Sequence, residues 1–260
     1  MSFEVSVDVT NPGQYFACCG LFELAHRLTG GGRARFAEGT FHVDADVTLP
    51  ALVDALVSTK LVQVDPADDT GSAIDVGAPF VALRLDWWHQ AHGGVRDLKV
   101  WAGTMESVRI ARSMQGAMRA PQFADRGLLD VGVVAYDPDA PTKKVEPFYF
   151  DARRAPNSHS RDVGFSPNDL GLETTASPAV ELLCLIGLQR FRPRPTKERR
   201  IFDYFAWGAS VPISVAPALA SGGVPTPGSH GYRFESWFRT GQRKHKAFRA
   251  ATALSRGEAQ

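Results

Sequence analysis

The 260-residue chain has few cysteines and no long apolar run. Its three cysteines, Cys18, Cys19 and Cys184, suit neither a disulfide framework nor a zinc site, so we expect buried thiols and no bound metal. No segment approaches the roughly 18 consecutive apolar residues that a membrane span requires. The first residues show neither the basic nor the apolar region of a signal peptide. We therefore expect a cytoplasmic protein that does not contact membranes.

The common catalytic motifs are missing as well. The sequence contains no Gly-rich loop ending in Lys-Ser/Thr, no dinucleotide fingerprint, no Gly-x-Ser-x-Gly and no His-Glu-x-x-His. His89 and His92 could share a helix face, but no third ligand nearby indicates a metal. A polar loop with Asp151, His159 and Asp162 could supply a general base, although contact with nucleic acid or another subunit is the favoured interpretation. We expect no cofactor and no enzymatic activity.

Charge is distributed unevenly along the chain, although its net charge is only +1. Residues 1–79 contain four Lys/Arg and eleven Asp/Glu, residues 80–187 contain twelve and thirteen, and residues 188–260 contain thirteen and four. The last segment therefore carries +9, which attracts a polyanion, and the first carries −7, which repels one. This asymmetry predicts an oriented encounter with nucleic acid or with a basic partner.

The first predicted helix follows a strand of alternating apolar and polar residues. Asn11 is a good N-cap, Pro12 suits the first helical position, and Gln14 is placed to complete a capping box. Gly13 and Gly20 lower helix propensity by about 1 kcal/mol each, so we expect them to allow close packing against a neighbouring element. The helix should be buried against a sheet.

Strand and helix patterns are interspersed without a regular βαβ period. The remaining predicted helices cover residues 48–58, 104–119 and 179–188. The predicted strands cover residues 3–9, 35–43, 80–85, 98–101, 131–136, 147–150, 201–207, 211–215 and 232–238. We expect one α+β domain over residues 1–240, with a mainly antiparallel sheet and packed helices, followed by a basic, flexible tail over residues 241–260.

Arginines gather on one side of the predicted helix 104–119. At 100° per residue, Arg109, Arg112 and Arg119 lie opposite the apolar side that contains Ile110 and Met114. Exposed guanidinium groups in a row match phosphate oxygens through paired hydrogen bonds. We therefore expect this stripe to bind the phosphates of a nucleic acid.

Further candidate nucleic-acid-binding residues lie in two basic segments. One is the polar loop after the predicted strand 147–150, and the other leaves the helix 179–188 in an extended conformation because of Pro193 and Pro195. The candidates in these segments are Arg153, Arg154, Asn157, Arg161, Arg190, Arg192, Arg194, Lys197, Arg199 and Arg200.

Three stretches of the sequence carry a family resemblance. They are NPGQYFACCGLFELAHRL at residues 11–28, LDWW with LKVWAG at residues 85–103, and a third that runs from FDARR through DVGFSPND to GLQRFRP at residues 150–193. The chain resembles the CRISPR-associated proteins of type I-G (formerly I-U) systems, which are assigned as the large-subunit equivalent of the Cascade interference complex. The likeness covers about residues 3–215.

The resemblance implies a non-enzymatic subunit whose partners are other Cascade subunits, guide RNA, double-stranded target DNA and a helicase-nuclease. Such a subunit helps to recognise the motif beside the target and supports R-loop formation. At 260 residues the chain is short for a large subunit and shows no C-terminal helical bundle. Two alternatives stay open: a guide-RNA-processing endoribonuclease with His159 or His92 as general base, and a backbone subunit repeated along the guide.

Overall fold

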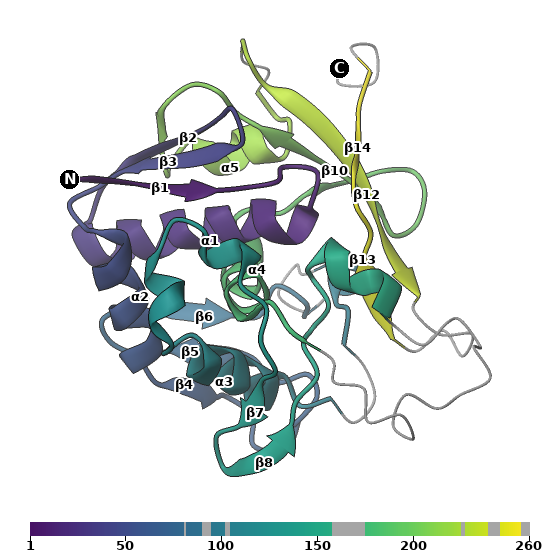
Figure 1. The fold of residues 1–260 in the computed structure, drawn as a ribbon. Coiled ribbons are helices and arrows are strands. Elements are labelled where there is room, and N and C mark those ends of the chain that lie inside the picture. Colours follow the sequence, from purple (N-terminus) through teal and green to yellow (C-terminus); the bar gives the residue numbers. More distant parts are fainter. Residues whose placement is uncertain are drawn as a thin grey trace.

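Two buried helices lie at the centre of the molecule (Figure 1). Helix α1 spans Pro12–Thr29 and helix α4 spans Pro178–Arg190. A Cβ atom added at Gly20 would overlap the carbonyl of Leu183, and one added at Gly187 would overlap the carbonyl of Phe16. Only glycine permits two helix backbones to approach this closely. The computed structural model describes residues 1–80, 82–89, 95–101, 105–157, 175–224, 227–238 and 245–255.

Antiparallel sheets surround the helix pair. The first sheet has the order β1-β3-β2-β11 and comprises β1 (Ser2–Ser6), β3 (Thr40–Asp44), β2 (Arg33–Ala37) and β11 (Val211–Pro212). The second has the order β13-β12-β10-β9, with β14 also paired to β12, and comprises β13 (Lys246–Phe248), β12 (His230–Phe238), β10 (Ile201–Ala206), β9 (Arg194–Pro195) and β14 (Thr252–Ala253). The described chain is therefore an α+β fold built on antiparallel pairs.

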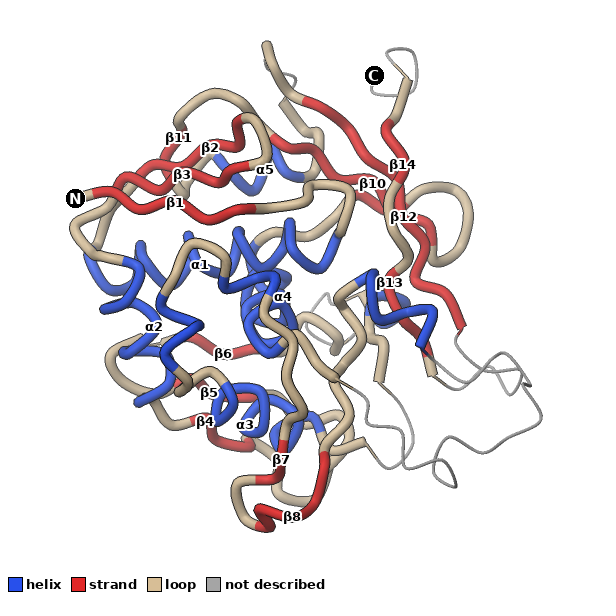
Figure 2. Tube along the Cα trace, in the orientation of Figure 1, coloured by secondary structure: helices blue, strands red, loops and turns tan. Residues whose placement is uncertain are grey.

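Smaller elements complete the fold on the other side of the helix pair (Figure 2). A three-stranded sheet contains β4 (Leu61–Gln63), β5 (Ile74–Val76) and β6 (Leu83–Leu85), and a hairpin contains β7 (Tyr136–Asp137) and β8 (Ala140–Lys144). Helices α2 (Leu49–Ser58) and α3 (Ser107–Ala117) also lie on this side, whereas α5 (Ala216–Ala220) lies on the opposite side, next to β10 (Figure 1). Short 3-10 helices cover Arg96–Leu98, Pro121–Ala124, Leu128–Asp130 and Ala152–Asn157. Within the described residues, no helix combines the length and apolar character needed to cross a membrane.

Aromatic side chains join the elements into one large hydrophobic cluster that extends from Phe3 to Ala251. The ring of Tyr15 stacks on Phe36 with centroids 5.0 Å apart, and its hydroxyl donates to the carbonyl of Phe205 at 2.8 Å. Trp87 contacts α4 by donating its indole N–H to the carbonyl of Leu185 at 2.9 Å. Burial of such large side chains supplies most of the stabilisation of the fold.

The predicted start of α1 is confirmed, with one correction. The Asn11 side chain accepts hydrogen bonds from the backbone N–H of Gly13 and Gln14, and Pro12 occupies the first turn. Gln14 forms no capping box with Asn11, because its side-chain oxygen accepts from the N–H of Asp8 at 2.7 Å. The expected close packing at Gly13 is confirmed, since an added Cβ there would overlap the carbonyl of Phe150.

Several predicted strands differ in the structure. Residues 35–43 form a hairpin and not one strand, because Glu38 and Gly39 adopt positive φ angles of 49° and 74° and reverse the chain. Residues 98–101 and 147–150 are buried without joining a sheet, and Val133 forms only an isolated bridge with Ala176. Alternating or apolar residues indicate burial in such segments, but they do not show that a partner strand is present.

The expectation of a flexible tail from residue 241 does not hold for the described residues 245–255. Strand β13 pairs with β12, and Phe248 is fully buried with its ring 4.8 Å from that of Phe234 and 5.2 Å from that of Phe150. The segment is basic, but a buried aromatic anchors it. Residues 239–244 and 256–260 lie outside the described residues.

Candidate nucleic-acid interface

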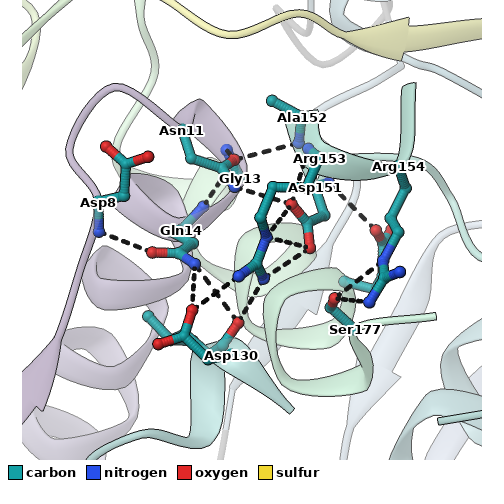
Figure 3. A network of polar contacts seen from close by, with 12 residues as sticks. Asp8, Asn11, Gly13, Gln14, Asp130, Asp151, Ala152, Arg153, Arg154 and Ser177 are labelled. Atoms are coloured by element: carbon teal, nitrogen blue, oxygen red, sulfur yellow. Dashed lines mark hydrogen bonds and ion pairs between the residues drawn. The ribbon is translucent and has the colours of Figure 1, made fainter. Parts of the chain in front are cut away.

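Arg153, a predicted phosphate-binding residue, lies in a network of polar contacts between α1 and α4 (Figure 3). Its guanidinium group contacts the carboxylates of Asp151 at 2.8 Å and Asp130 at 2.7 Å, and it donates to the carbonyl of Leu129 at 2.7 Å. Burial opposes ionisation of Asp151, but hydrogen bonds from Arg153 and Ser177 outweigh it and hold the pKa of Asp151 below its ordinary value. Arg153 therefore joins the segments around residues 130 and 151.

Asn11 connects this network to the first turn of α1. Its amide N–H donates to Asp151 at 2.7 Å, while its oxygen accepts from the N–H of Ala152 at 3.1 Å and from that of Gly13 at 3.1 Å. One side chain thus caps the helix and fixes a segment about 140 residues away in the sequence.

Glu181 on α4 is the second buried carboxyl group of the network. Its two oxygens accept from the backbone N–H of Asp151 at 3.1 Å and of Phe150 at 3.2 Å. Burial raises the pKa of Glu181 to about 8, although these two hydrogen bonds act in the opposite direction. Glu181 and Asp151 have no exposed surface, so no substrate reaches them in this structure.

The arginines of α3 are mostly engaged by neighbouring groups. Arg109 forms ion pairs with Asp137 at 2.6 Å and Glu106 at 3.3 Å. Arg112 donates through two nitrogens to the carbonyl of Leu61 at 3.0 and 2.8 Å. Arg119 is exposed and has no ion-pair partner among the described residues. The predicted phosphate-binding stripe therefore contains two arginines that neighbouring groups hold, Arg109 and Arg112, and one, Arg119, that has no such partner among the described residues.

Other candidates also have internal partners. Arg154 donates to the hydroxyl of Thr175 at 2.7 Å, and Arg190 forms an ion pair with the buried Glu23. Asn157 ends the 3-10 helix Ala152–Asn157. The candidates Arg161, His92 and His159 lie outside the described residues.

A second group of cations lies on the sheet that contains β9, β10 and β12. Strand pairing places Asp203 of β10 between Arg194 and Arg233. Asp203 accepts from Arg233 at 2.8 Å and from Arg194 at 3.3 Å, and both guanidinium groups keep about 36% of their surface exposed. The opposite face of the same strands presents Tyr204 and Phe234 to the core. The charged face therefore points away from the core.

The same face continues along β12 to an aromatic residue. Because side chains alternate along a strand, Arg233, Glu235 and Trp237 share one face. The guanidinium group of Arg249 lies 4.1 Å from the centre of the Trp237 ring, forms an ion pair with Glu235 at 3.4 Å, and remains 49% exposed. We call the face formed by these groups the basic sheet face; it consists of Arg194, Asp203, Arg233, Glu235, Trp237 and Arg249.

Further predicted cations lie next to the basic sheet face. Arg200 stacks on Phe238 at 4.7 Å, Arg199 forms an ion pair with Asp97 at 3.0 Å, and Lys197 is exposed. Arg192 is half-buried. The apolar pattern predicted this strand but not its charged face, which the alternation of Arg233, Glu235 and Trp237 could have indicated.

Lys246 of β13 is a half-buried cation near this region. Its ammonium group donates to the carbonyl of Asp97 at 2.9 Å. Burial lowers the pKa of Lys246 to about 8, an effect that nearby arginines strengthen and the Asp97 carboxylate opposes. Lys246 therefore fixes β13 to the segment around residue 97.

Comparison with protein-family models, curated proteins and solved structures gives no match for this chain. Within the described parts of the chain, no group of three or more His, Cys, Asp or Glu side chains is placed to hold a metal ion. The three cysteines are free and buried.

Proposed function

We propose that this chain is a non-enzymatic subunit of an RNA-guided type I interference complex and contacts nucleic acid through the basic sheet face. In that role it helps to recognise the motif beside the target, supports opening of the duplex into an R-loop, and provides a docking surface for the helicase-nuclease. Its partners are the other Cascade subunits, guide RNA and double-stranded target DNA, and it acts in the cytoplasm. The sequence resemblance over residues 3–215 supports this assignment.

The observation that carries the proposal is the stacking of Arg249 on Trp237 at 4.1 Å. The partly exposed indole of Trp237 can stack on a nucleobase, while the guanidinium groups of Arg194, Arg233 and Arg249 can contact phosphates. The face also lies within the segment that carries a net charge of +9. Positive charge draws a polyanion to this end of the chain, and the aromatic ring adds an attraction that does not depend on salt.

The test measures binding of the purified chain to a target duplex and to a single strand by fluorescence anisotropy at several salt concentrations. Arg249→Ala should lower the slope of log affinity against log salt by about 0.9 for each duplex phosphate contact that is lost. Trp237→Ala should weaken single-strand binding by about 1–3 kcal/mol, the usual value for a stacked base, with a smaller change in the salt slope.

Arg84→Ala is the matched control. Arg84 is an exposed strand arginine with a carboxylate partner, Asp75 at 2.8 Å, and its 52% exposure resembles that of Arg249. It lies on β6, on the other side of the helix pair from β12 (Figure 1). Equal effects of Arg84→Ala and Arg249→Ala would show that the basic sheet face has no special role.

The copy number of the chain distinguishes the proposal from a repeated backbone subunit. Native mass spectrometry of the co-expressed complex should give one copy per complex for a recognition subunit, whereas a backbone subunit would be present in several copies. A guide-processing enzyme would instead cleave the repeat RNA, and substitution of His92 or His159 would abolish that cleavage. We expect no cleavage by the purified chain.

A further inference from the structure

A cleft lies between α3, β4 and the β7–β8 hairpin. Two cavities of about 330 Å³ each adjoin there, and both are lined by Arg112, Pro138 and Asp139. We call this continuous recess the α3–β8 cleft. Each cavity is near the lower end of the size range of small-molecule sites, whereas a DNA interface is a much larger surface. The cleft therefore suits a ligand of about the size of a nucleotide.

The charged side chains of the cleft favour an anion. Its cations are Lys60, Arg109, Arg112, Arg119 and Lys143, and its acidic side chains are Glu106, Asp137 and Asp139, so the lining has more positive than negative groups. Both Glu106 and Asp137 form ion pairs with Arg109. Within the described residues, Lys60, Arg119 and Lys143 have no ion-pair partner.

Asp137 stays ionised beside this cleft without cancelling its free cations. A hydrogen bond from the backbone N–H of Asp139 holds the pKa of Asp137 below its ordinary value. Burial acts in the opposite direction, and the positive charges of Arg109 and Lys143 lower the pKa further. The nearer of these cations is Arg109, whose ion pair with Asp137 measures 2.6 Å. Arg109 and Asp137 form a fixed wall of the recess, and although Arg109 is shared with Glu106, the lining as a whole keeps five cations against three carboxylates.

Arg112 is oriented before any ligand arrives. Two of its nitrogens donate to the carbonyl of Leu61, at 3.0 and 2.8 Å, so the plane of the guanidinium group is fixed where the two cavities meet. A guanidinium group has five N–H donors, and the remaining ones have no acceptor among the described residues. Binding to an oriented donor loses less conformational entropy than binding to a mobile side chain. Val62, 47% exposed, and Pro138 add an apolar wall that a nucleoside ring can cover.

We propose that the α3–β8 cleft binds a phosphate monoester, with Arg112, Arg119 and Lys143 as its donors. The oxygens of a phosphate monoester match the fork of Arg112, and its double negative charge matches the unpaired cations. The phosphate belongs either to a free nucleotide or to the phosphorylated end of a nucleic acid. This inference does not rest on the proposed function, because it concerns another part of the surface.

The test compares adenosine monophosphate with adenosine by isothermal titration calorimetry on the full chain. Adenosine monophosphate should bind at one site, and adenosine should bind at least about tenfold more weakly, since it lacks the phosphate. A 5′-phosphorylated trinucleotide and its 5′-hydroxyl form distinguish the two sources of the phosphate. Tighter binding of the phosphorylated trinucleotide than of adenosine monophosphate indicates the end of a nucleic acid, and equal binding indicates a free nucleotide.

The double variant Arg119→Ala with Lys143→Ala should weaken binding of adenosine monophosphate by at least about tenfold with little change in Tm, because neither side chain forms an ion pair among the described residues. Arg126→Ala is the control, since Arg126 is also exposed and lies outside the cleft. Trp237→Ala should also leave this affinity unchanged, so failure here is separable from failure of the basic sheet face. Equal affinities for adenosine and adenosine monophosphate, binding of a glutamate-rich peptide in place of the phosphate, or an unaffected double variant would each overturn the proposal.

Discussion

Protonation of Glu181 should control how stability depends on pH. In the unfolded chain this carboxyl group titrates near its ordinary pKa of 4.5, and in the folded chain burial raises its pKa to about 8. The folded state therefore binds more protons than the unfolded state between these two values. Stability is fully present below about pH 4.5, falls as the pH rises toward 8, and then levels off.

The size of the effect follows from the same two values. Each tenfold change in the ionisation constant is worth about 1.4 kcal/mol, so raising the pKa of Glu181 from 4.5 to about 8 costs the ionised form about 5 kcal/mol. Over this range the free energy of unfolding should fall by at most about 1.4 kcal/mol per pH unit because of this group. That is a large fraction of the roughly 5–15 kcal/mol by which folded proteins are usually stable.

Urea unfolding of the wild type and of Glu181→Gln from pH 5 to pH 9 measures this contribution. Glutamine does not ionise, so its profile should be flat where that of the wild type falls. At pH 5 the variant should be less stable by about 1–3 kcal/mol, because its NH₂ group faces one of the two N–H donors of Phe150 and Asp151. Glu198→Gln, which makes the same change at an exposed site, should leave the profile unchanged. If wild type and Glu181→Gln show parallel profiles, Glu181 does not titrate in this window and the reasoning is wrong.

Three further predictions concern other parts of the molecule. Gly187→Ala should lower the free energy of unfolding by at least about 3 kcal/mol in urea, because its Cβ would overlap the carbonyl of Phe16, whereas Gly116→Ala on α3 meets no atom within 4 Å and should be neutral or stabilising by up to about 1 kcal/mol. The pKa of Lys246, lowered from 10.5 to about 8, should make stability rise between those pH values, so the wild type should show a minimum near pH 8; Lys246→Met should remove the rise when the urea unfolding series is extended to about pH 10.5. Charge reversal at the exposed Asp44 and Asp46 should weaken co-purification with basic partner subunits; unchanged co-purification would mean that these carboxylates only face solvent.

Local signals in the sequence predicted α1 and α4 well, because their caps and apolar runs are encoded within a few residues. Asn11, Pro12 and Gly30 mark the ends of α1 as the structure shows them. The partners of charged side chains could not be predicted in this way. Arg153 reaches Asp130, and Arg190 reaches Glu23, across 23 and 167 positions of the chain. Arginines that look free in the sequence are therefore often paired in the fold.

Predicted strands were wrong where a segment is buried by side-chain packing without pairing to another strand. Phe148 and Phe150 are fully buried, yet their segment forms no sheet, because the backbone N–H of Phe150 bonds to the Glu181 side chain. The basic sheet face was missed for a related reason. Its charges come from β9, β12 and the segment after β13, and only strand pairing brings them together.

The contact between Gly20 and Gly187 bears on how the chain is synthesised. When α1 leaves the ribosome, α4, which covers α1, has not yet been synthesised. Strand β11, the last strand of the sheet that packs on α1, has not been synthesised either. At about 5–20 residues per second, α1 waits on the order of ten seconds for its partner. During this interval an apolar helix lies exposed on the nascent chain. Chaperones that hold emerging chains should therefore bind this protein early in translation, and slow codons before α4 should lower its yield.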